Sequence, residues 1–326
     1  MNKVSYISIY IISNSIITGL ILPFVIKKLH AQKPVKAFLF LIKELHYSQK
    51  EAQRLIAKGR LQINGIPMTD TSGIVQGDFD FICFEPHTRG LKPIFQTNDF
   101  ALFEKPSGVL IHPQNRYTSY SLIDEIKYQF GRNANITHRI DQETSGLVLA
   151  ALNKESERQL KIMFQERRIE KSYLAFVHGH VKEKLHITVP LLRKNDDSAI
   201  VRMIVKVDEH GKSSETFITP LHYFFDLDMT LVEARPKTGR QHQIRVHLFH
   251  VKHPIVGDPI YGQNEENIIR FLDKKLSNEE RRKQSGASRL LLHANTLSFS
   301  YQDKQYNLQS SADFKNEVLE LFHNPK

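Results

Sequence analysis

Apolar residues at helical spacing predict two short helices near the start of the chain. Ala37, Leu41 and Leu45 recur every four residues, which indicates the first helix. Ser48 and Glu51 stand three residues apart, and this capping-box spacing marks the start of the second helix. Its apolar face consists of Ala52, Leu55 and Ile56, and it is expected to end at Gly59.

The pattern after these helices changes to short stretches typical of strands. The stretch RLQINGIPM, residues 60–68, predicts a hairpin that turns at Asn-Gly. Gly77-Asp78 is expected to turn into the strand FDFICFE, residues 79–85. Together these elements define residues 34–90 as a small α/β domain.

Residues 91–326 are expected to form a larger domain of the α+β class. Short strands, helices and polar turns follow one another there, and they predict a mixed, mainly antiparallel sheet. One helix is expected to begin near Asn153, with Leu160, Met163 and Phe164 on its core face. Residues 87–98 have the Gly and Pro content of a linker, and the highly charged residues 263–289 are expected to lie on the surface.

The net charge of the chain indicates a polyanionic partner. There are 45 Lys and Arg against 35 Asp and Glu, a formal net charge of +10. The surplus concentrates between Lys27 and Arg60, where nine basic residues stand against two glutamates. Nucleic acid is the first candidate for such a partner, and an anionic membrane surface is the second. The single cysteine, Cys83, excludes a disulfide framework and fits a reducing compartment.

The segment THRIDQETSG, residues 137–146, places an arginine and an aspartate before a turn and the apolar run LVLAAL. The carboxylate, Asp141, raises the question of what it would act on in that position. HRID is only superficially similar to the His-Arg-Asp loop of protein kinases, because an extra residue intervenes and no glycine-rich loop or Asp-Phe-Gly triplet accompanies it. The sequence also lacks a P-loop pattern, so phosphoryl transfer is not expected.

The segment RPKTGRQHQIRVHLFHVKHPIVGDPIYG, residues 235–262, predicts a helix. Thr238 and Gln241 have capping-box spacing, and apolar residues follow at helical spacing from Ile244. Arg245 lies beside that apolar stripe, where its guanidinium can point into a cleft. Four histidines suggest a metal site, but carboxylates at ligand spacing are absent and we expect no metal. These histidines are His242, His247, His250 and His253.

Five motifs in order give the larger domain a resemblance to one enzyme family. They are EKPSG (104–108), HRIDQETSG (138–146), KSYLA (171–175), TGRQHQIRVH with HPIVGDPIYG (238–262), and LLLHA (290–294). Over roughly residues 95–323 the chain closely resembles the RluA-type family of pseudouridine synthases. The resemblance implies an enzyme that detaches uracil from its ribose, rotates the base and rejoins it through a carbon atom, without a cofactor or metal.

The resemblance places the main catalytic role on Asp141. A carboxylate at a glycosidic carbon can attack the sugar or stabilise its developing positive charge, and both alternatives fit the sequence. Arg245 corresponds to the family arginine that pairs with this aspartate and holds it ionised. Tyr173 corresponds to a tyrosine that packs on the uracil and handles the proton on the ring carbon. Glu143 occupies a variable position and is expected to be a solvated turn residue.

Contacts to RNA are implied for five basic residues. Arg139 corresponds to an arginine that fills the space left by a flipped base, with a phosphate contact as the alternative. Lys171 either contacts a backbone phosphate or is simply exposed. The stretch SQKEAQRLIAKGRLQINGIP, residues 48–67, resembles the S-four RNA-binding domain, with a generic basic helical hairpin as the alternative. That resemblance implies RNA contacts by Arg54, Lys58 and Arg60, mostly to phosphates.

Large-subunit ribosomal RNA is the expected substrate, because the domain arrangement resembles that of the ribosomal members of the family. Transfer RNA is the second candidate. A non-catalytic RNA-binding or ribosome-assembly factor is a further interpretation, which the presence of Asp141, Tyr173 and Arg245 disfavours. A cytoplasmic monomer is the expected form.

Residues 1–33 are treated as an apolar extension in front of these domains. From Val4 to Ile26 there are 23 residues without a charge, which is long enough to cross a bilayer. Ser, Thr, Asn and Pro residues dilute the stretch, so its insertion into a membrane would be marginal. It fits a single anchor, an uncleaved export signal, or translation from a misassigned start codon. We favour the last, and a membrane is not the expected partner.

Overall fold

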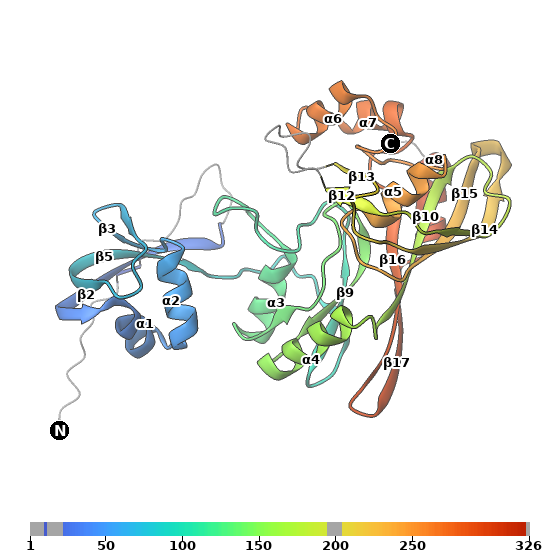
Figure 1. Cartoon of the computed structure of the whole chain (residues 1–326). Coiled ribbons are helices and arrows are strands. Elements are labelled where there is room, and N and C mark those ends of the chain that lie inside the picture. Colours follow the sequence, from blue (N-terminus) through green and yellow to red (C-terminus); the bar gives the residue numbers. More distant parts are fainter. Residues whose placement is uncertain (1–9, 12–21, 194–203, 324–326) are drawn as a thin grey trace. The chain divides into compact units, whose positions relative to one another are not determined.

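The computed structural model describes residues 10–11, 22–193 and 204–323, and the chain divides into two compact units. The small unit comprises the residues up to Thr88 together with His112–Asp124. The large unit comprises Arg89–Ile111 and the residues from Glu125 onward. Both units are drawn in Figure 1, where the small unit is mainly blue.

In the described part of the chain up to Thr88, the small unit has two helices and an antiparallel sheet of order β1-β2-β5-β3-β4. Leu41, Ala52 and Ile56 of the helices pack against Phe79 and Phe81 of the sheet and form its core. Its elements are β1 (Tyr10–Ile11), β2 (Phe24–Lys36), α1 (Ala37–Leu45), α2 (Gln49–Ala57), β3 (Leu61–Ile63), β4 (Ile66–Met68) and β5 (Ile74–Phe84).

The two predicted helices and the predicted hairpin are confirmed. Ser48 and Glu51 form a reciprocal capping box at the start of α2. Asn64 and Gly65, between β3 and β4, have φ values of 50° and 78°, which are the positive angles that an Asn-Gly hairpin turn requires.

Two predictions about the small unit are wrong. Residues 24–33 do not belong to an extension, because β2 begins at Phe24 and pairs with β5. Gly77-Asp78 is not a turn but lies inside β5, where Gly77 has a φ of 69° near an irregularity in the register of β2 and β5. The rest of the apolar stretch lies mainly outside the described residues. Within the described ranges, no helix has the length and apolar character needed to cross a membrane.

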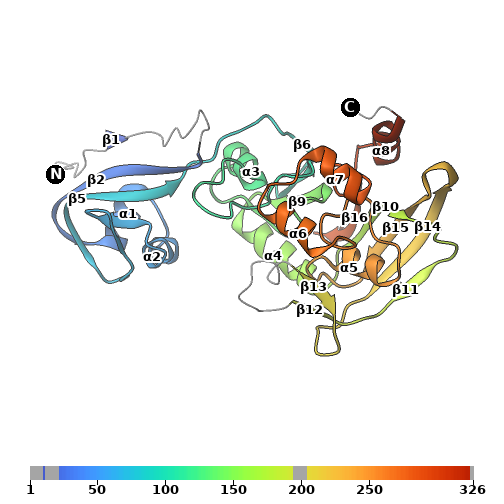
Figure 2. The same ribbon diagram turned by 90° about the horizontal axis from the view of Figure 1, so that it is seen from above.

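A mixed sheet organises the large unit, as Figures 1 and 2 show. The strand order is β11-β14-β15-β10-β16-β9-β7-β6, with β17 paired to β16 and β8 paired to β9. Among the described strands of this sheet, β16 and β9 are parallel and the other pairs are antiparallel. The predicted α+β class and mainly antiparallel sheet are therefore confirmed.

The bounds of the elements after Thr88 are as follows. The strands of the large sheet are β6 (Pro93–Gln96), β7 (Phe100–Lys105), β8 (Asn135–Ile136), β9 (Ser145–Ala151), β10 (Glu170–His178), β11 (Leu185–Ile187), β14 (Thr216–Phe224), β15 (Met229–Pro236), β16 (Leu292–Tyr301) and β17 (Lys304–Gln309). β12 (Leu191–Arg193) and β13 (Val205–Val207) form a separate pair. The helices are α3 (Leu122–Phe130), α4 (Lys154–Gln165), α5 (Gln243–His250), α6 (Glu265–Leu272), α7 (Asn278–Ser285) and α8 (Phe314–His323), with a 3-10 turn at Phe225–Leu227.

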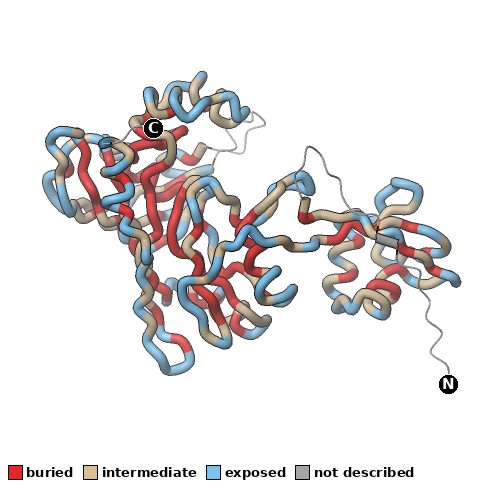
Figure 3. The backbone as a smooth tube through the Cα atoms, turned by 180° about the vertical axis from the view of Figure 1, so that it is seen from behind, coloured by how far each residue is buried: buried red, intermediate tan, exposed pale blue. Residues whose placement is uncertain are grey.

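The core of the large unit follows its central strands, which Figure 3 shows in red. Helix α4 contributes Leu160 and Met163 to that core, as predicted. Two other predictions need correction. The presumed linker 87–98 contains the edge strand β6, and the charged segment 263–289 forms α6 and α7. Ile268 of α6 packs with Val246 of α5, so this segment is not merely a surface excursion.

The register of the central strands brings distant parts of the chain together. Gly146 of β9 lies opposite Ala294 of β16, which lies opposite Tyr173 of β10. A Cβ atom at Gly146 would collide with the backbone of Ala294, and Gly146 has a φ of 102°, so only glycine fits there. The turn that precedes Gly146 and carries Asp141 is thereby held at the centre of the sheet.

Candidate active site

A pocket of about 90 Å³ brings together five of the eight predicted site residues. They come from the loop before β9, from β10 and from α5, and they are Arg139, Asp141, Lys171, Tyr173 and Arg245. The pocket shares several lining residues with a larger groove of about 900 Å³. The motifs quoted from distant parts of the sequence therefore form one site.

Asp141 begins a tight turn in which Thr144 N–H donates to the carbonyl of Asp141. The segment 105–108 holds the backbone of that turn. Lys105 Nζ donates to the carbonyl of Gln142 over 2.9 Å, and Ser107 Oγ donates to that of Glu143 over 2.6 Å. Lys105 is 1% exposed and donates also to the carbonyls of Pro106 and Val109. The motif EKPSG thus serves as a support for the aspartate.

Arg245 is buried and connects two carboxylates. Its Nη1 donates to Asp141 Oδ2 over 3.2 Å. Its Nε and Nη2 donate to the two oxygens of Asp258 over 2.7 and 2.8 Å, which is the bidentate geometry that favours arginine over lysine. Asp258 is 1% exposed, whereas the side chain of Asp141 is 26% exposed. One guanidinium therefore joins a carboxylate in the core to a second carboxylate that lines the pocket.

Electrostatics keep Arg245 and Asp258 ionised. Burial alone would lower the pKa of Arg245, but the charge of Asp258 and then that of Asp141 outweigh burial and raise it. Burial would raise the pKa of Asp258, yet Arg245 and the backbone N–H groups of Tyr261 and Ile260 lower it below its usual value. Arg245 and Asp258 thus form a stable buried ion pair at neutral pH, and Asp141 lies on the pocket side of the same guanidinium.

Tyr173 lies beside this group on β10 and is kept as a neutral phenol. Burial raises the pKa of Tyr173, and the charge of Asp141 raises it further. Tyr173 lines the pocket, and an aromatic ring offers a face on which a flat base can stack.

Sequence reasoning did not identify Asp258, Tyr261 and His242 as neighbours of Arg245. Asp258 and Tyr261 lie in the quoted stretch GDPIYG but received no role. Tyr261 places its ring 5.0 Å from the guanidinium, and its hydroxyl is 2.9 Å from His242 Nδ1. His242 Nε2 lies 3.8 Å from Asp141 Oδ2. The signal in the sequence for this buried turn was the position of Asp258, between a glycine and a proline and after a strand-like run.

The predicted capping box of α5 is wrong. The helix begins at Gln243, and its N-cap is His242, which has a φ of 52° and makes no side-chain cap. The side chain of Gln243 organises the loop instead, because its Oε1 accepts from Thr238 Oγ1 and Arg240 N–H. Three histidines of this segment have separate hydrogen-bond partners. His242 bonds with the hydroxyl of Tyr261, His247 with the hydroxyl of Ser214, and His253 with the carbonyl of His178.

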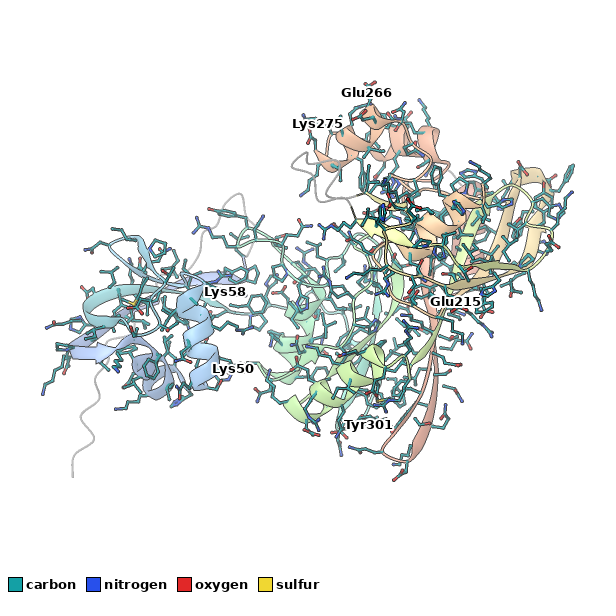
Figure 4. All side chains as sticks on the ribbon, in the orientation of Figure 1. Lys50, Lys58, Glu215, Glu266, Lys275 and Tyr301 are labelled. Atoms are coloured by element: carbon teal, nitrogen blue, oxygen red, sulfur yellow. The ribbon has the colours of Figure 1, made fainter. Side chains whose placement is uncertain are left out.

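Cations outnumber carboxylates in the lining of the groove beside the pocket. Two carboxylates, Glu170 and Glu215, accompany them, and Figure 4 labels Glu215. Phe164 and Phe217 add aromatic surface. The six cations are Arg139, Arg167, Lys171, Arg235, Lys237 and Arg240. Arg139 is exposed, whereas Lys171 is half-buried and its pKa is lowered by burial, so Lys171 is not simply a solvent-exposed lysine.

The other three predicted site residues lie in the small unit. Arg54 and Lys58 are exposed on α2 and at its C-cap, and Figure 4 shows Lys50 and Lys58 at opposite ends of this helix. Arg60 is half-buried, with its guanidinium 4.4 Å from the ring centroid of Phe24. Arg54 and Lys58 are thus available to a polyanion, and Arg60 packs partly against the protein.

Comparisons with known proteins show which family the chain resembles. A family model described as RNA pseudouridylate synthase matches residues 99–250. An uncharacterized RNA pseudouridine synthase of Helicobacter pylori (strain J99) is 39% identical over 290 residues, which are 89% of this chain and 96% of the relative. The ribosomal large subunit pseudouridine synthase C of Buchnera aphidicola is 33% identical, over 67% of this chain and 65% of its own length. The tRNA pseudouridine synthase C of Haemophilus ducreyi is 29% identical, over 71% and 93%.

A solved structure shares the fold. Human RNA pseudouridylate synthase domain containing 1 superposes with a TM-score of 0.56 at 26% identity, covering 70% of this chain and 86% of that protein. Fold, site and relatives define the class of the protein: it is an isomerase that converts uridine to pseudouridine in RNA. Within this class, the chain belongs to the RluA-type family of RNA pseudouridine synthases.

Buried histidines predict that the fold loses stability in mild acid. Burial lowers the pKa of His242, His247 and His293 to about 4 in each case. The unfolded chain, with a pKa of about 6.5 per histidine, binds more protons between these values. Stability is therefore complete above about pH 6.5 and falls toward pH 4, by up to about 1.4 kcal/mol per pH unit for each histidine.

Urea unfolding at pH 7.5, 6 and 5 and constant ionic strength measures this loss. Glu104, whose pKa is raised by burial, opposes the trend at acidic pH. The His247→Gln protein, which keeps a polar group near Ser214, should show a flatter dependence than the wild type. An unfolding free energy that is unchanged from pH 7.5 to 5 would contradict the assignment of neutral buried histidines.

Proposed function

We propose that Asp141 is the catalytic carboxylate and that it acts on the C1′ atom of a uridine flipped into the small pocket. The observation that carries this proposal is the position of Asp141: among the described residues that line the pocket, it has the only carboxylate. It is also the exposed partner of Arg245, whose second carboxylate, Asp258, is buried. One acid is therefore free to meet a substrate.

The reaction needs little more than this carboxylate and a closed pocket. The N1–C1′ bond breaks, the base turns, and a C5–C1′ bond forms, after which C5 loses a proton and N1 carries one. Asp141 either attacks C1′ or stabilises the positive charge that develops on the sugar. Arg245 orients the carboxylate in either case, because Arg245 is itself fixed by Asp258.

Tyr173 and the groove supply the remaining functions in this proposal. The ring of Tyr173 stacks on the uracil, and its neutral hydroxyl is placed to exchange the C5 proton with water or with the substrate. Arg139 enters the helix position vacated by the base, which offsets part of the few kcal/mol that flipping costs. Lys171 and the other groove cations bind the flanking phosphates.

Large-subunit ribosomal RNA is the proposed substrate. Two observations support it: several relatives are named for the ribosomal large subunit, and a small unit rich in exposed basic residues precedes the synthase unit. Transfer RNA remains the second candidate, because other relatives are named tRNA pseudouridine synthase.

An in vitro assay separates the two substrates. RNA from cells that lack the gene is divided into ribosomal and transfer fractions, incubated with the purified protein, and mapped with carbodiimide. The proposal expects new pseudouridines at one or a few sites of the large-subunit RNA. New sites confined to transfer RNA would overturn the substrate assignment but leave the chemistry intact.

The small unit is proposed to be an S-four-like domain that binds RNA phosphates through α2. The Arg54→Gln/Lys58→Gln protein should bind RNA more weakly, and its slope of log K against log salt should be smaller by about 1 to 2, because about one counterion is released per phosphate contact. Binding titrations at several salt concentrations measure both quantities.

The matched control is Lys182→Gln/Lys304→Gln, which removes the same charge from exposed sites outside the groove. This control should bind RNA nearly as tightly as the wild type. If the two double variants show equal slopes, net charge alone accounts for binding and the α2 surface has no special role.

A further inference from the structure

A second buried arginine connects the same two loops that Arg245 connects. Arg281 of α7 places Nη1 2.7 Å from Glu143 Oε2, and its Nη2 donates to the carbonyl of Gly257 over 2.8 Å. Glu143 lies two residues after Asp141, and Gly257 immediately precedes Asp258. Arg245 therefore joins the two turns through their aspartates, and Arg281 joins the same turns through the neighbouring residues.

This contact is built into the fold and is not a surface ion pair. Arg281 is 7% exposed, and the side chain of Glu143 is 17% exposed. The ring centroid of Phe271, from α6, lies 5.2 Å from the guanidinium. The hydroxyl of Ser285 donates to the carbonyl of Arg281, and Gly257 N–H donates to the carbonyl of Ser285. The expectation that Glu143 is a solvated turn residue is wrong, because α7 covers its carboxylate.

We propose that Arg281 is a positioning residue for the reaction. By tying Glu143 to the carbonyl of Gly257, it fixes the separation of the Asp141 turn and the Asp258 turn, and so it fixes the aim of the Asp141 carboxylate. This inference rests on the proposed catalytic role of Asp141. Arg281 lines neither the pocket nor the groove, so it acts through Glu143 and touches no substrate.

The arrangement explains why the aspartate turn needs support on two sides. Lys105 and Ser107 hold the backbone of the turn from the side of β7. Arg281 holds the side chain of Glu143, in the same turn, from the side of α7. Without Arg281, Glu143 would remain as an unpaired anion two residues from Asp141, and the turn would be free to shift. A displacement of the reacting group by about 1 Å can reduce the rate by about 100-fold.

The test compares kinetics of four variants on the same RNA. Arg281→Met should lower kcat by about 100-fold and leave KM for RNA within about twofold of the wild type, because no RNA contact is lost. Glu143→Gln keeps a hydrogen-bond acceptor and should lower kcat by about tenfold. The double variant should have a kcat no lower than that of Arg281→Met alone, because both changes act on the same contact. The kcat of Arg281→Lys should lie between those of Arg281→Met and the wild type, because an ammonium cannot reproduce the contacts that the planar guanidinium makes with Glu143 and with the carbonyl of Gly257.

Arg270→Met is the matched control. It breaks the ion pair of Arg270 Nη2 with Glu280 Oε1 between α6 and α7, but leaves the contact to Glu143 in place. Its kcat should stay close to that of the wild type. Melting curves accompany each variant, and all rates are measured well below the melting temperatures. If Arg281→Met does not fold, the conservative Glu143→Gln decides the question by itself.

Two results would overturn the inference. A folded Arg281→Met or Glu143→Gln protein with wild-type kcat would show that the contact serves stability alone. A loss that appears in KM would show that the segment binds RNA. Asp141→Asn, measured in parallel, separates the two claims: if it is inactive while Arg281→Met is fully active, only the positioning role fails. If Asp141→Asn is active, the proposed function fails and the positioning role with it.

Discussion

The Asp141→Asn protein is expected to lose at least about 1,000-fold in kcat while it keeps its fold and its affinity for RNA. Asparagine has the size of aspartate and can still accept from Arg245, but it lacks the negative charge that C1′ requires. Stability should change by about 1 kcal/mol or less, because Arg245 retains its bidentate partner Asp258. RNA affinity should stay within about threefold, since Asp141 makes no phosphate contact.

Tritium release from C5 of labelled uridine in RNA measures this loss, since pseudouridine formation exchanges that hydrogen. The control is Asp226→Asn, which removes the same charge from an exposed 3-10 turn and should be fully active. Substantial turnover by a pure Asp141→Asn preparation would exclude this carboxylate from the chemistry.

The Asp258→Asn protein is expected to lose about 3–5 kcal/mol of stability, because the change leaves a buried guanidinium without its main counter-charge. In a unit of this size, that loss corresponds to a decrease in Tm of roughly 6–20 °C. Activity measured well below Tm should fall as well, since Arg245 would turn toward Asp141 and withdraw it from the substrate. Thermal melts and tritium release provide the two measurements.

Asp141→Asn is the matched variant for Asp258→Asn. Both variants remove one carboxylate from the same guanidinium, one on its buried side and one on its pocket side. The account expects Asp258→Asn to act mainly on Tm and Asp141→Asn to act almost entirely on kcat. The reverse pattern would mean that the structural and reactive carboxylates have been exchanged.

The site residues were largely accessible from the sequence, because short motifs carry them. Asp141 precedes a turn and a buried strand, Tyr173 lies in a strand, and Arg245 follows a predicted helix start. The structure brings all three to one pocket. Their catalytic roles remain proposals that the variants above test.

The partners that hold these residues were not predictable in the same way. Asp258 binds Arg245 through a bidentate contact, although the two residues lie 13 positions apart in the sequence. Arg281 forms an ion pair with Glu143, which lies 138 positions away. No local pattern encodes such distances. The error at the start of α5 has a related cause: the side chain of Gln243 binds the loop before the helix, so Thr238 is not a capping residue. Tertiary hydrogen bonds overrode the local signal.

The boundary errors have a physical cause as well. The stretch from Phe24 was grouped with an apolar extension, since strands and membrane-like segments share apolar residues. Its pairing with β5 depends on residues some 50 positions away, which composition does not reveal. Residues 263–289 are mostly charged or polar, yet Ile268 and Arg281 bury one face of α6 and α7 against the core.

The central claim is that this protein makes pseudouridine in RNA with Asp141 as the catalytic carboxylate. The most direct test is a carbodiimide map of total RNA from cells that lack the gene, complemented either with the wild type or with Asp141→Asn at equal expression. The account predicts that one or a few uridine sites lose modification in the deletion and that only the wild type restores them. Restoration of the same sites by Asp141→Asn would contradict it.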